Sequence, residues 1–385
     1  MASLRGWGFE REEISLLDKV KQLNFTLILL IVAIAAIGFA MLYSAANGDI
    51  DPWARRQMIR FAVGVGVMIC VALVDIRVWL RGAYVIYGAA LILLIAVEII
   101  GEIGMGAQRW IDLGFFQLQP SELMKLALVI ALARYFHALT LEDVRRPTVL
   151  IVPTLMVLTP AAMVLRQPDL GTAVMLMAGS GAVFFLAGVR MWKFAVVIGA
   201  GLAMIPVAWH VLEDYQKSRI LTFLHPEADP LGAGYHILQS KIALGSGGVL
   251  GKGFLAGTQS HLNFLPEKQT DFIFTMLAEE FGLVGGLGLI GLYGLVLAYG
   301  FAIAVRSRNQ FGRLLALGVT TTLFLYVFIN IAMVTGLIPV VGVPLPLLSY
   351  GGTAMMTMLA GMGLIMGVYV HRDVMIRRHG AADDF

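Results

Sequence analysis

The chain of 385 residues is 59% hydrophobic and only 14% charged, with a mean hydropathy of +0.83. A water-soluble protein carries about a quarter charged residues, so the composition excludes a soluble globular protein and indicates a polytopic membrane protein. The net charge of +3 is spread over loops and forms no concentrated basic face, which argues against a nucleic-acid partner. Cys70 is the single cysteine, so no disulfide can form within the chain.

Ten apolar segments are long enough to cross about 30 Å of hydrocarbon. The first follows an N-terminal tail (1–24) and has no small-residue cleavage site after it, which indicates a retained span. The segments are 25–46, 58–75, 82–101, 119–138, 148–165, 170–188, 193–212, 271–304, 313–338 and 350–371. They predict an all-α bundle of about ten transmembrane helices, forming one domain over 25–372, with a C-terminal tail at 373–385.

Lys and Arg residues gather in one set of short loops, whereas the opposite set holds only Arg55, Arg56, Arg109 and Arg166. The basic set comprises the N-terminal tail, Arg77, Arg81, Arg145, Arg146, Arg190, Lys193, Arg306, Arg308, Arg313 and the C-terminal tail. Because cytoplasmic loops are enriched in Lys and Arg, we expect both termini to be cytoplasmic. The long loop 213–270 is then extracytoplasmic, and its length, glycines and helical spacing over 235–244 predict an ordered, functional segment.

Glu122 and Lys125 lie three residues apart in an otherwise apolar segment, which places them on one helix face. An isolated charge inside a membrane is costly, so each requires a partner or a wet cavity. Two interpretations remain open: a structural ion pair, or a pair that lines a polar cavity. Glu279 and Glu280 point about 100° apart around a helix, so one of them could pair with Lys125.

Asp271 is the strongest catalytic candidate, because we predict it in the first turn of an apolar helix, where the helix dipole favours an ionised carboxylate. A plain N-terminal carboxylate with Thr270 as the cap is the alternative. That alternative leaves unexplained the polar residues His261, Glu267 and Lys268 nearby, of which Glu267 and Lys268 are candidates for binding substrate. The spacing of His261, Glu267 and Asp271 matches no standard metal site.

Arg109 and Trp110 form a second outer candidate. Trp110 could be an interfacial anchor, and Arg109 could grip a phosphate or stack on a sugar. Arg219 and Lys241 add positive charge on the same predicted side.

The connection before the last span contains three prolines, at 339, 344 and 346, followed by Ser349-Tyr350-Gly351-Gly352. Prolines favour a sharply bent or re-entrant connection. The glycines either allow close packing or open one wall of a lipid-accessible groove, and Ser349 is a further candidate site residue.

Five motifs together resemble the SEDS family (shape, elongation, division and sporulation proteins), most closely its RodA branch. The resemblance runs from the first span to about Arg372. The motifs are GAQRWIDLG (106–114), QPSELMK (119–125), QPDLGTA (167–173), SGGVLGKGFLAGTQSHLNFLPEKQTDFIF (246–274) and LPLLSYGGTAM (345–355).

The resemblance implies a ten-helix peptidoglycan glycosyltransferase that polymerises lipid II into β-1,4 glycan strands during cell elongation. It also implies an outer-face active site in the bacterial cytoplasmic membrane, a class B penicillin-binding transpeptidase as partner, and contact with the cell-shape (elongation) complex. The family's essential acid matches Asp271, its tryptophan matches Trp110, and its intramembrane acid–base pair matches Glu122 and Lys125.

The expected mechanism is inverting transfer with Asp271 as general base. Arg109, Arg219 or Lys241 would stabilise the departing pyrophosphate, and the need for a divalent cation (Mg or Mn) stays open. The alternatives are a lipid II flippase and a non-catalytic scaffold. A transporter is expected to carry repeated halves and a polar site near the midplane, whereas the charged cluster here is predicted at the outer surface.

Overall fold

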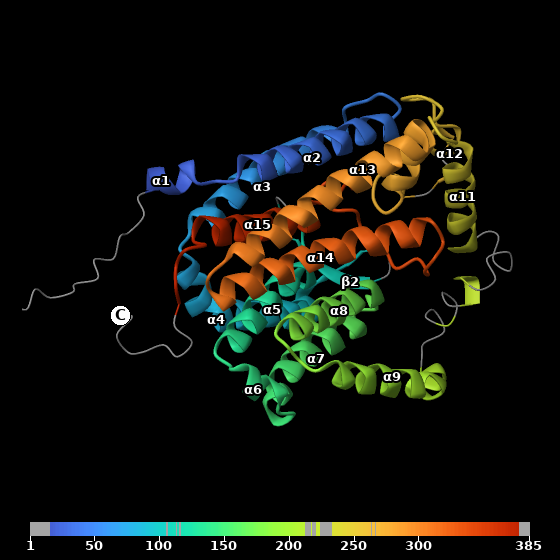
Figure 1. Ribbon diagram of the computed structural model, residues 1–385. Helices are drawn as coiled ribbons and strands as arrows, with labels where there is room; N and C mark the ends of the chain where they lie inside the picture. The colour runs from blue at the N-terminus through green and yellow to red at the C-terminus, as the bar shows by residue number, and fades with distance from the viewer. Residues whose placement is uncertain are drawn as a thin grey trace, which may run out of the picture.

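The computed structural model describes residues 16–376, apart from 105–106, 113, 115–116, 212–216, 218–220, 224–232, 263 and 266. Ten helices correspond to the ten predicted spans (Figure 1). They are α2 (Phe25–Ala45), α3 (Ala54–Leu73), α4 (Ile76–Ile100), α5 (Pro120–His137), α7 (Ile151–Arg166), α8 (Leu170–Leu186), α9 (Met191–Val211), α13 (Ile273–Arg306), α14 (Gln310–Val334) and α15 (Gly352–Val370). Within the described residues, seven helical segments are long and apolar enough to cross a membrane.

Shorter elements complete the described chain. They are α1 (Leu16–Lys21), α6 (Leu141–Arg145), the 3-10 helix η1 (Thr148–Leu150), α11 (Ala233–Ser246) and α12 (Thr258–His261). The helix α11 confirms the helical spacing read over 235–244. Strands β1 (Glu102–Gly104), β2 (Ala107–Asp112) and β3 (Gln117–Leu118) form an antiparallel sheet in the order β1-β2-β3, which the sequence did not lead us to expect.

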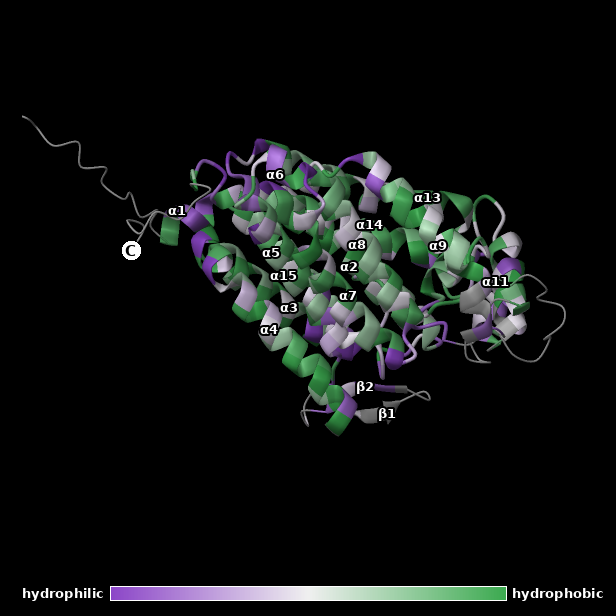
Figure 2. Cartoon of the chain, turned by 90° about the horizontal axis from the view of Figure 1, so that it is seen from below, coloured by the Kyte–Doolittle hydropathy of each residue, from purple (hydrophilic) through white to green (hydrophobic). Residues whose placement is uncertain are grey.

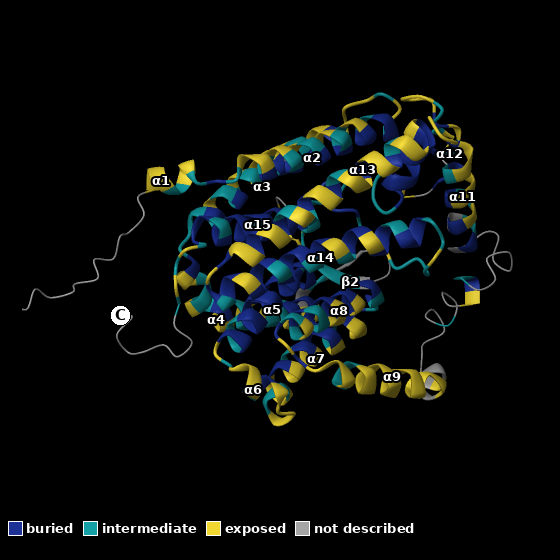
Figure 3. Ribbon diagram, viewed as in Figure 1, coloured by how far each residue is buried: buried dark blue, intermediate teal, exposed yellow. Residues whose placement is uncertain are grey.

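The helix α5 forms the centre of the bundle. Nearly all of its residues are buried, and it packs against α4, α8 and α14 (Figure 3). The outer helices expose large apolar side chains, as expected for surfaces that face lipid. Close helix contact relies on small residues, because a Cβ at Gly363 of α15 would lie 2.5 Å from the Met68 carbonyl oxygen of α3.

The polar residues of the bundle gather at its two ends. At one end, Lys19 donates to the Leu73 carbonyl at 3.2 Å, and the Arg308 amide donates to the Arg372 carbonyl at 2.9 Å. The helices α11 and α12 lie at the opposite end (Figure 1), and hydrophilic residues gather near both ends with apolar helices between them (Figure 2). The basic loops therefore share the end that carries α1.

The helix α13, which corresponds to the predicted span 271–304, is kinked at Gly282 (φ 65°, ψ −162°). The glycine-rich segment 248–253 enters this kink, and backbone hydrogen bonds of 2.9–3.1 Å join it to 279–284. A Cβ at Gly251 would lie 2.1 Å from the Glu280 carbonyl oxygen. The glycines thus permit backbone-to-backbone docking that satisfies groups freed by the kink.

Candidate active site

Asp271 lies in a turn before α13 and not in its first turn, so the predicted position was wrong. The helix begins at Ile273 with Phe272 at the N-cap position, and no side chain caps it. The proposed Thr270 cap was also wrong, because its hydroxyl donates to Glu267, at 3.2 Å to the carbonyl and 2.9 Å to the carboxylate. Glu267 has a φ of 50°, and the Thr270 amide closes the turn onto its carbonyl at 3.0 Å.

Three successive carbonyl oxygens, those of residues 269–271, are fixed by other segments. They accept hydrogen bonds from the Tyr350 amide (2.8 Å), the Ser349 hydroxyl (2.6 Å) and the Asn330 side-chain amide (2.8 Å), respectively. Ser349 thus holds the turn, and the connection 339–352, predicted to be bent, packs against it.

The Asp271 carboxylate has its pKa raised from 3.8 to about 6, first by burial and second by the nearby charge of Glu267. Among the described residues, none forms an ion pair or hydrogen bond with this carboxylate. The backbone of residue 342 lies near this carboxylate, since a Cβ at Gly342 would lie 3.5 Å from Oδ2. A desolvated carboxylate that retains its lone pairs and titrates near neutrality suits a general base.

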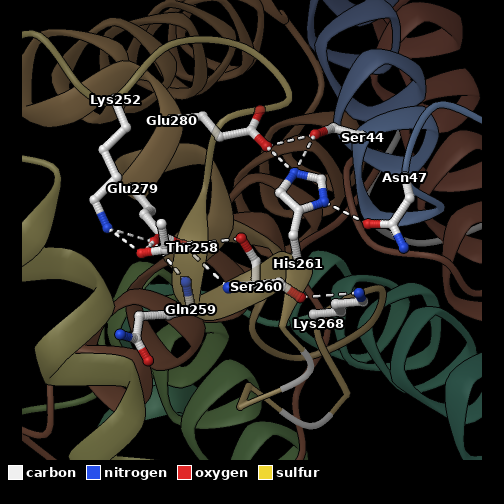
Figure 4. Close-up of polar contacts among 10 residues, drawn as sticks. All are labelled: Ser44, Asn47, Lys252, Thr258, Gln259, Ser260, His261, Lys268, Glu279 and Glu280. Atoms are coloured by element: carbon white, nitrogen blue, oxygen red, sulfur yellow. Dashed lines mark hydrogen bonds and ion pairs between the residues drawn. The ribbon is translucent and has the colours of Figure 1, made fainter.

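Glu279 is fully buried and holds the loop before α13 (Figure 4). One carboxylate oxygen accepts from Lys252 and from the Gln259 amide, both at 2.8 Å. The other accepts from the Ser260 amide (3.2 Å) and hydroxyl (2.8 Å). These bonds satisfy free amides at the start of α12. The prediction that Glu279 or Glu280 could form an ion pair with Lys125 was wrong.

Glu280, also fully buried, faces a different set of partners. Its Oε1 accepts from the Ser44 hydroxyl and lies 3.2 Å from His261 Nε2, while His261 Nδ1 contacts the Asn47 side chain (Figure 4). The cluster joins α2, α12 and α13. Lys268 is buried nearby, where burial lowers its pKa, and it donates to the Ser260 carbonyl at 2.9 Å. These contacts give Glu280, His261 and Lys268 partners within the protein and favour a structural role for the cluster.

Glu122 and Lys125 form a closed triad with Tyr326 of α14. Lys125 donates to Glu122 at 2.7 Å and also to the Tyr326 hydroxyl, which in turn donates to Glu122. Glu122 and Lys125 are only 3% and 4% exposed, so their charges neutralise each other in a place that solvent does not reach. This geometry favours an ion pair that joins α5 to α14.

The remaining outer candidates have other contacts in the structure. Arg109 donates to the Gln167 carbonyl at 2.9 Å and to the Pro168 carbonyl, which ties the sheet to the connection between α7 and α8. Trp110 lies on β2 opposite Glu102, and Lys241 is exposed on α11. Arg219 lies outside the described residues. Among the described residues, no hydrogen bond or ion pair joins Arg109 or Lys241 to Asp271.

Three residues at this site were missed in the sequence. Gln57 is buried in α3, which starts at Ala54 and not at 58, and it donates to the Ser349 carbonyl at 2.8 Å. Arg60, half-buried on the same helix, lies 5.0 Å over the Tyr350 ring. Arg60 and Asn330 could have been found, since polar side chains inside apolar spans are costly and are often functional.

Comparison with known proteins identifies the relatives of this chain. Residues 23–374 match the cell cycle protein family of FtsW, RodA and SpoVE. The chain is 44% identical over 361 residues to the peptidoglycan glycosyltransferase MrdB of Escherichia coli K12, covering 93% of this chain and 96% of that protein. It is 35% identical over 357 residues to stage V sporulation protein E of Bacillus subtilis, covering 90% and 96%.

Solved structures agree with this assignment. One, a peptidoglycan synthase complex that coordinates polymerization and crosslinking, contains a chain with a TM-score of 0.80 and 35% identity, covering 91% of this chain and 98% of that one. The rod shape determining protein RodA of Thermus thermophilus gives a TM-score of 0.69 and 32% identity, covering 91% and 97%. This chain therefore belongs to the FtsW/RodA/SpoVE family, the SEDS family that its motifs resemble, and is a multi-pass membrane protein.

Proposed function

We propose that this chain is a peptidoglycan glycosyltransferase that polymerises lipid II into β-1,4 glycan strands during cell elongation. The 44% identity to MrdB over 93% of the chain supports the activity. The observation that carries the mechanism is the Asp271 carboxylate, which is desolvated and lacks a side-chain partner in the described part of the chain, while its backbone is fixed at three successive carbonyls.

In this mechanism Asp271 removes the proton from the 4-hydroxyl of the acceptor sugar. The resulting oxygen attacks the anomeric carbon of the donor from the face opposite the lipid pyrophosphate. The bond between that carbon and the pyrophosphate oxygen breaks, its electron pair leaves with the pyrophosphate, and the configuration inverts from α to β. A positioned base contributes about 10²–10⁴-fold to such a step.

The departing pyrophosphate requires positive charge. Arg109 is occupied by two backbone carbonyls, so we assign this role first to Arg60. Its guanidinium lies over the ring of Tyr350, and the Tyr350 amide donates to the Gln269 carbonyl, two residues before Asp271. No group of three His, Cys, Asp or Glu side chains among the described residues could hold a metal ion, so a contributing divalent cation would be held mainly by the pyrophosphate.

The same proposal places both termini in the cytoplasm and Asp271 on the outer face, because the basic loops share the end that carries α1. Labelling with a membrane-impermeant maleimide tests this orientation. After replacement of Cys70, a cysteine at Asn47 should react in intact spheroplasts, and one at Asp373 should react only after lysis. The solved synthase complex supports a class B penicillin-binding transpeptidase as partner.

The deciding experiment compares lipid II polymerisation by the purified wild type and the Asp271→Asn variant, with and without the partner, whose transpeptidase site is blocked. Asp51→Asn is the control, since Asp51 is an exposed carboxylate in a surface pair with Arg55. We expect polymer from the wild type and the control and none from folded Asp271→Asn. Equal polymer from Asp271→Asn would refute the mechanism, and no polymer from wild type with partner and metal would favour a flippase.

A further inference from the structure

Asn330 on α14 is fully buried in an apolar bundle, and its side-chain amide bridges two segments around Asp271. Its Nδ2 donates to the Asp271 carbonyl at 2.8 Å and to the Val343 carbonyl at 2.7 Å. A buried polar group is unfavourable unless it is hydrogen-bonded. The Asn330 Oδ1 has no partner among the described residues, whereas its Nδ2 is fully matched. Here both hydrogens are used, and both acceptors belong to backbone next to the proposed catalytic carboxylate.

The Val343 side of this bridge also borders the carboxylate. Gly342 has a φ of +71°, in the left-handed region, and a Cβ added there would lie 3.5 Å from Asp271 Oδ2. Asn330 therefore fixes both the backbone that carries the carboxylate and the backbone that faces it. Ser349 adds a second support through its 2.6 Å bond to the Thr270 carbonyl, and it is held from α3 by Gln57.

We propose that Asn330 is a positioning residue for glycan transfer, which holds the Asp271 carboxylate in place to receive the acceptor proton. This inference rests on the proposed function, in which Asp271 is the base. Asn330 touches no substrate in this scheme. Because a misplacement of about 1 Å can cost about 100-fold in rate, losing its donors should lower kcat while KM for lipid II stays unchanged.

The test compares Asn330→Leu, which keeps the approximate size but has no donor, with Thr322→Val on the same helix. Thr322 is buried and donates to the Gly318 carbonyl at 2.9 Å, so its replacement also removes one buried hydrogen bond but leaves the Asp271 turn intact. We expect kcat of Asn330→Leu to fall about 10- to 100-fold. The pH midpoint of kcat should also move down as the carboxylate regains water, and Thr322→Val should change neither.

Ser349→Ala serves as a milder variant if Asn330→Leu does not fold. It removes one of the three supports, and kcat should fall about 3- to 10-fold at unchanged KM. The positioning role is refuted if Asn330→Leu, or Ser349→Ala in its place, keeps the wild-type kcat and pH profile. In that case the proposed function still stands, provided that Asp271→Asn is inactive. If Thr322→Val loses kcat as strongly as Asn330→Leu, the role is merely structural. Full activity of Asp271→Asn would instead refute the proposed function.

Discussion

The Asp271→Asn substitution should raise the thermal stability of the protein at neutral pH while it abolishes polymerisation. In the wild type, the carboxyl pKa is about 6 in the folded state against an ordinary value of 3.8. The folded protein thus binds this proton more tightly than the unfolded chain, and its stability falls as pH rises from about 4 to about 6. At 1.36 kcal/mol per pKa unit the gap corresponds to about 3 kcal/mol, an upper bound because the side chain is partly exposed and water screens its charge.

An Asn at this position has no ionised form, so the variant should unfold at a higher temperature than the wild type at pH 7.5 and match it near pH 4. Thermal unfolding of both purified proteins in detergent at pH 4, 6 and 7.5 measures this difference. Polymerisation by the wild type should follow the opposite trend, with about 10% of the plateau rate at pH 5 and half at pH 6. A variant that is less stable than the wild type at pH 7.5, or a rate that is flat from pH 5 to 7, would refute the argument.

Three further changes test other parts of the structure. Lys125→Met leaves Glu122 as an uncompensated buried charge and should cost roughly 3–5 kcal/mol of stability, whereas the double variant with Glu122→Gln should recover part of this loss in thermal unfolding. Gly251→Ala should release the docked loop and speed its proteolysis, because the added Cβ meets backbone at 2.1 Å, while Gly288→Ala, with open space around it, should not. Arg60→Gln should lower kcat by about 100-fold, and Arg60→Lys should lose less because it keeps the charge; equal rates for all three proteins would remove Arg60 from the mechanism.

The membrane spans could be predicted because their signal is local. A run of apolar residues of sufficient length indicates a span whatever its neighbours are, and the observed ends differ from the predicted ones by six residues at most. Sheet β1-β2-β3 was missed because its strands are only three, six and two residues long. Strands this short give too little alternation to identify.

The site was predicted less completely, because it depends on contacts between distant segments. The spacing of Glu122 and Lys125 predicts their pairing, but Tyr326, about 200 positions later, completes the triad. Likewise, the kink at Gly282 is stabilised by the loop that docks into it, and no local pattern in the apolar helix marks it. The turn before α13 also holds Asp271 outside the helix through bonds from other segments.

The carboxylates at this end of the bundle differ in what surrounds their oxygen atoms, and this difference assigns their roles. Glu279 accepts hydrogen bonds on both oxygens, and Glu280 accepts from Ser44 on one. Such bonds hold these carboxylates within the protein's own hydrogen-bond network. Asp271 is the reverse case, since the described residues bond its backbone and not its side chain. A carboxylate held firmly by its main chain and left free at its oxygens can accept a proton from a substrate, and this is why we assign the chemistry to Asp271.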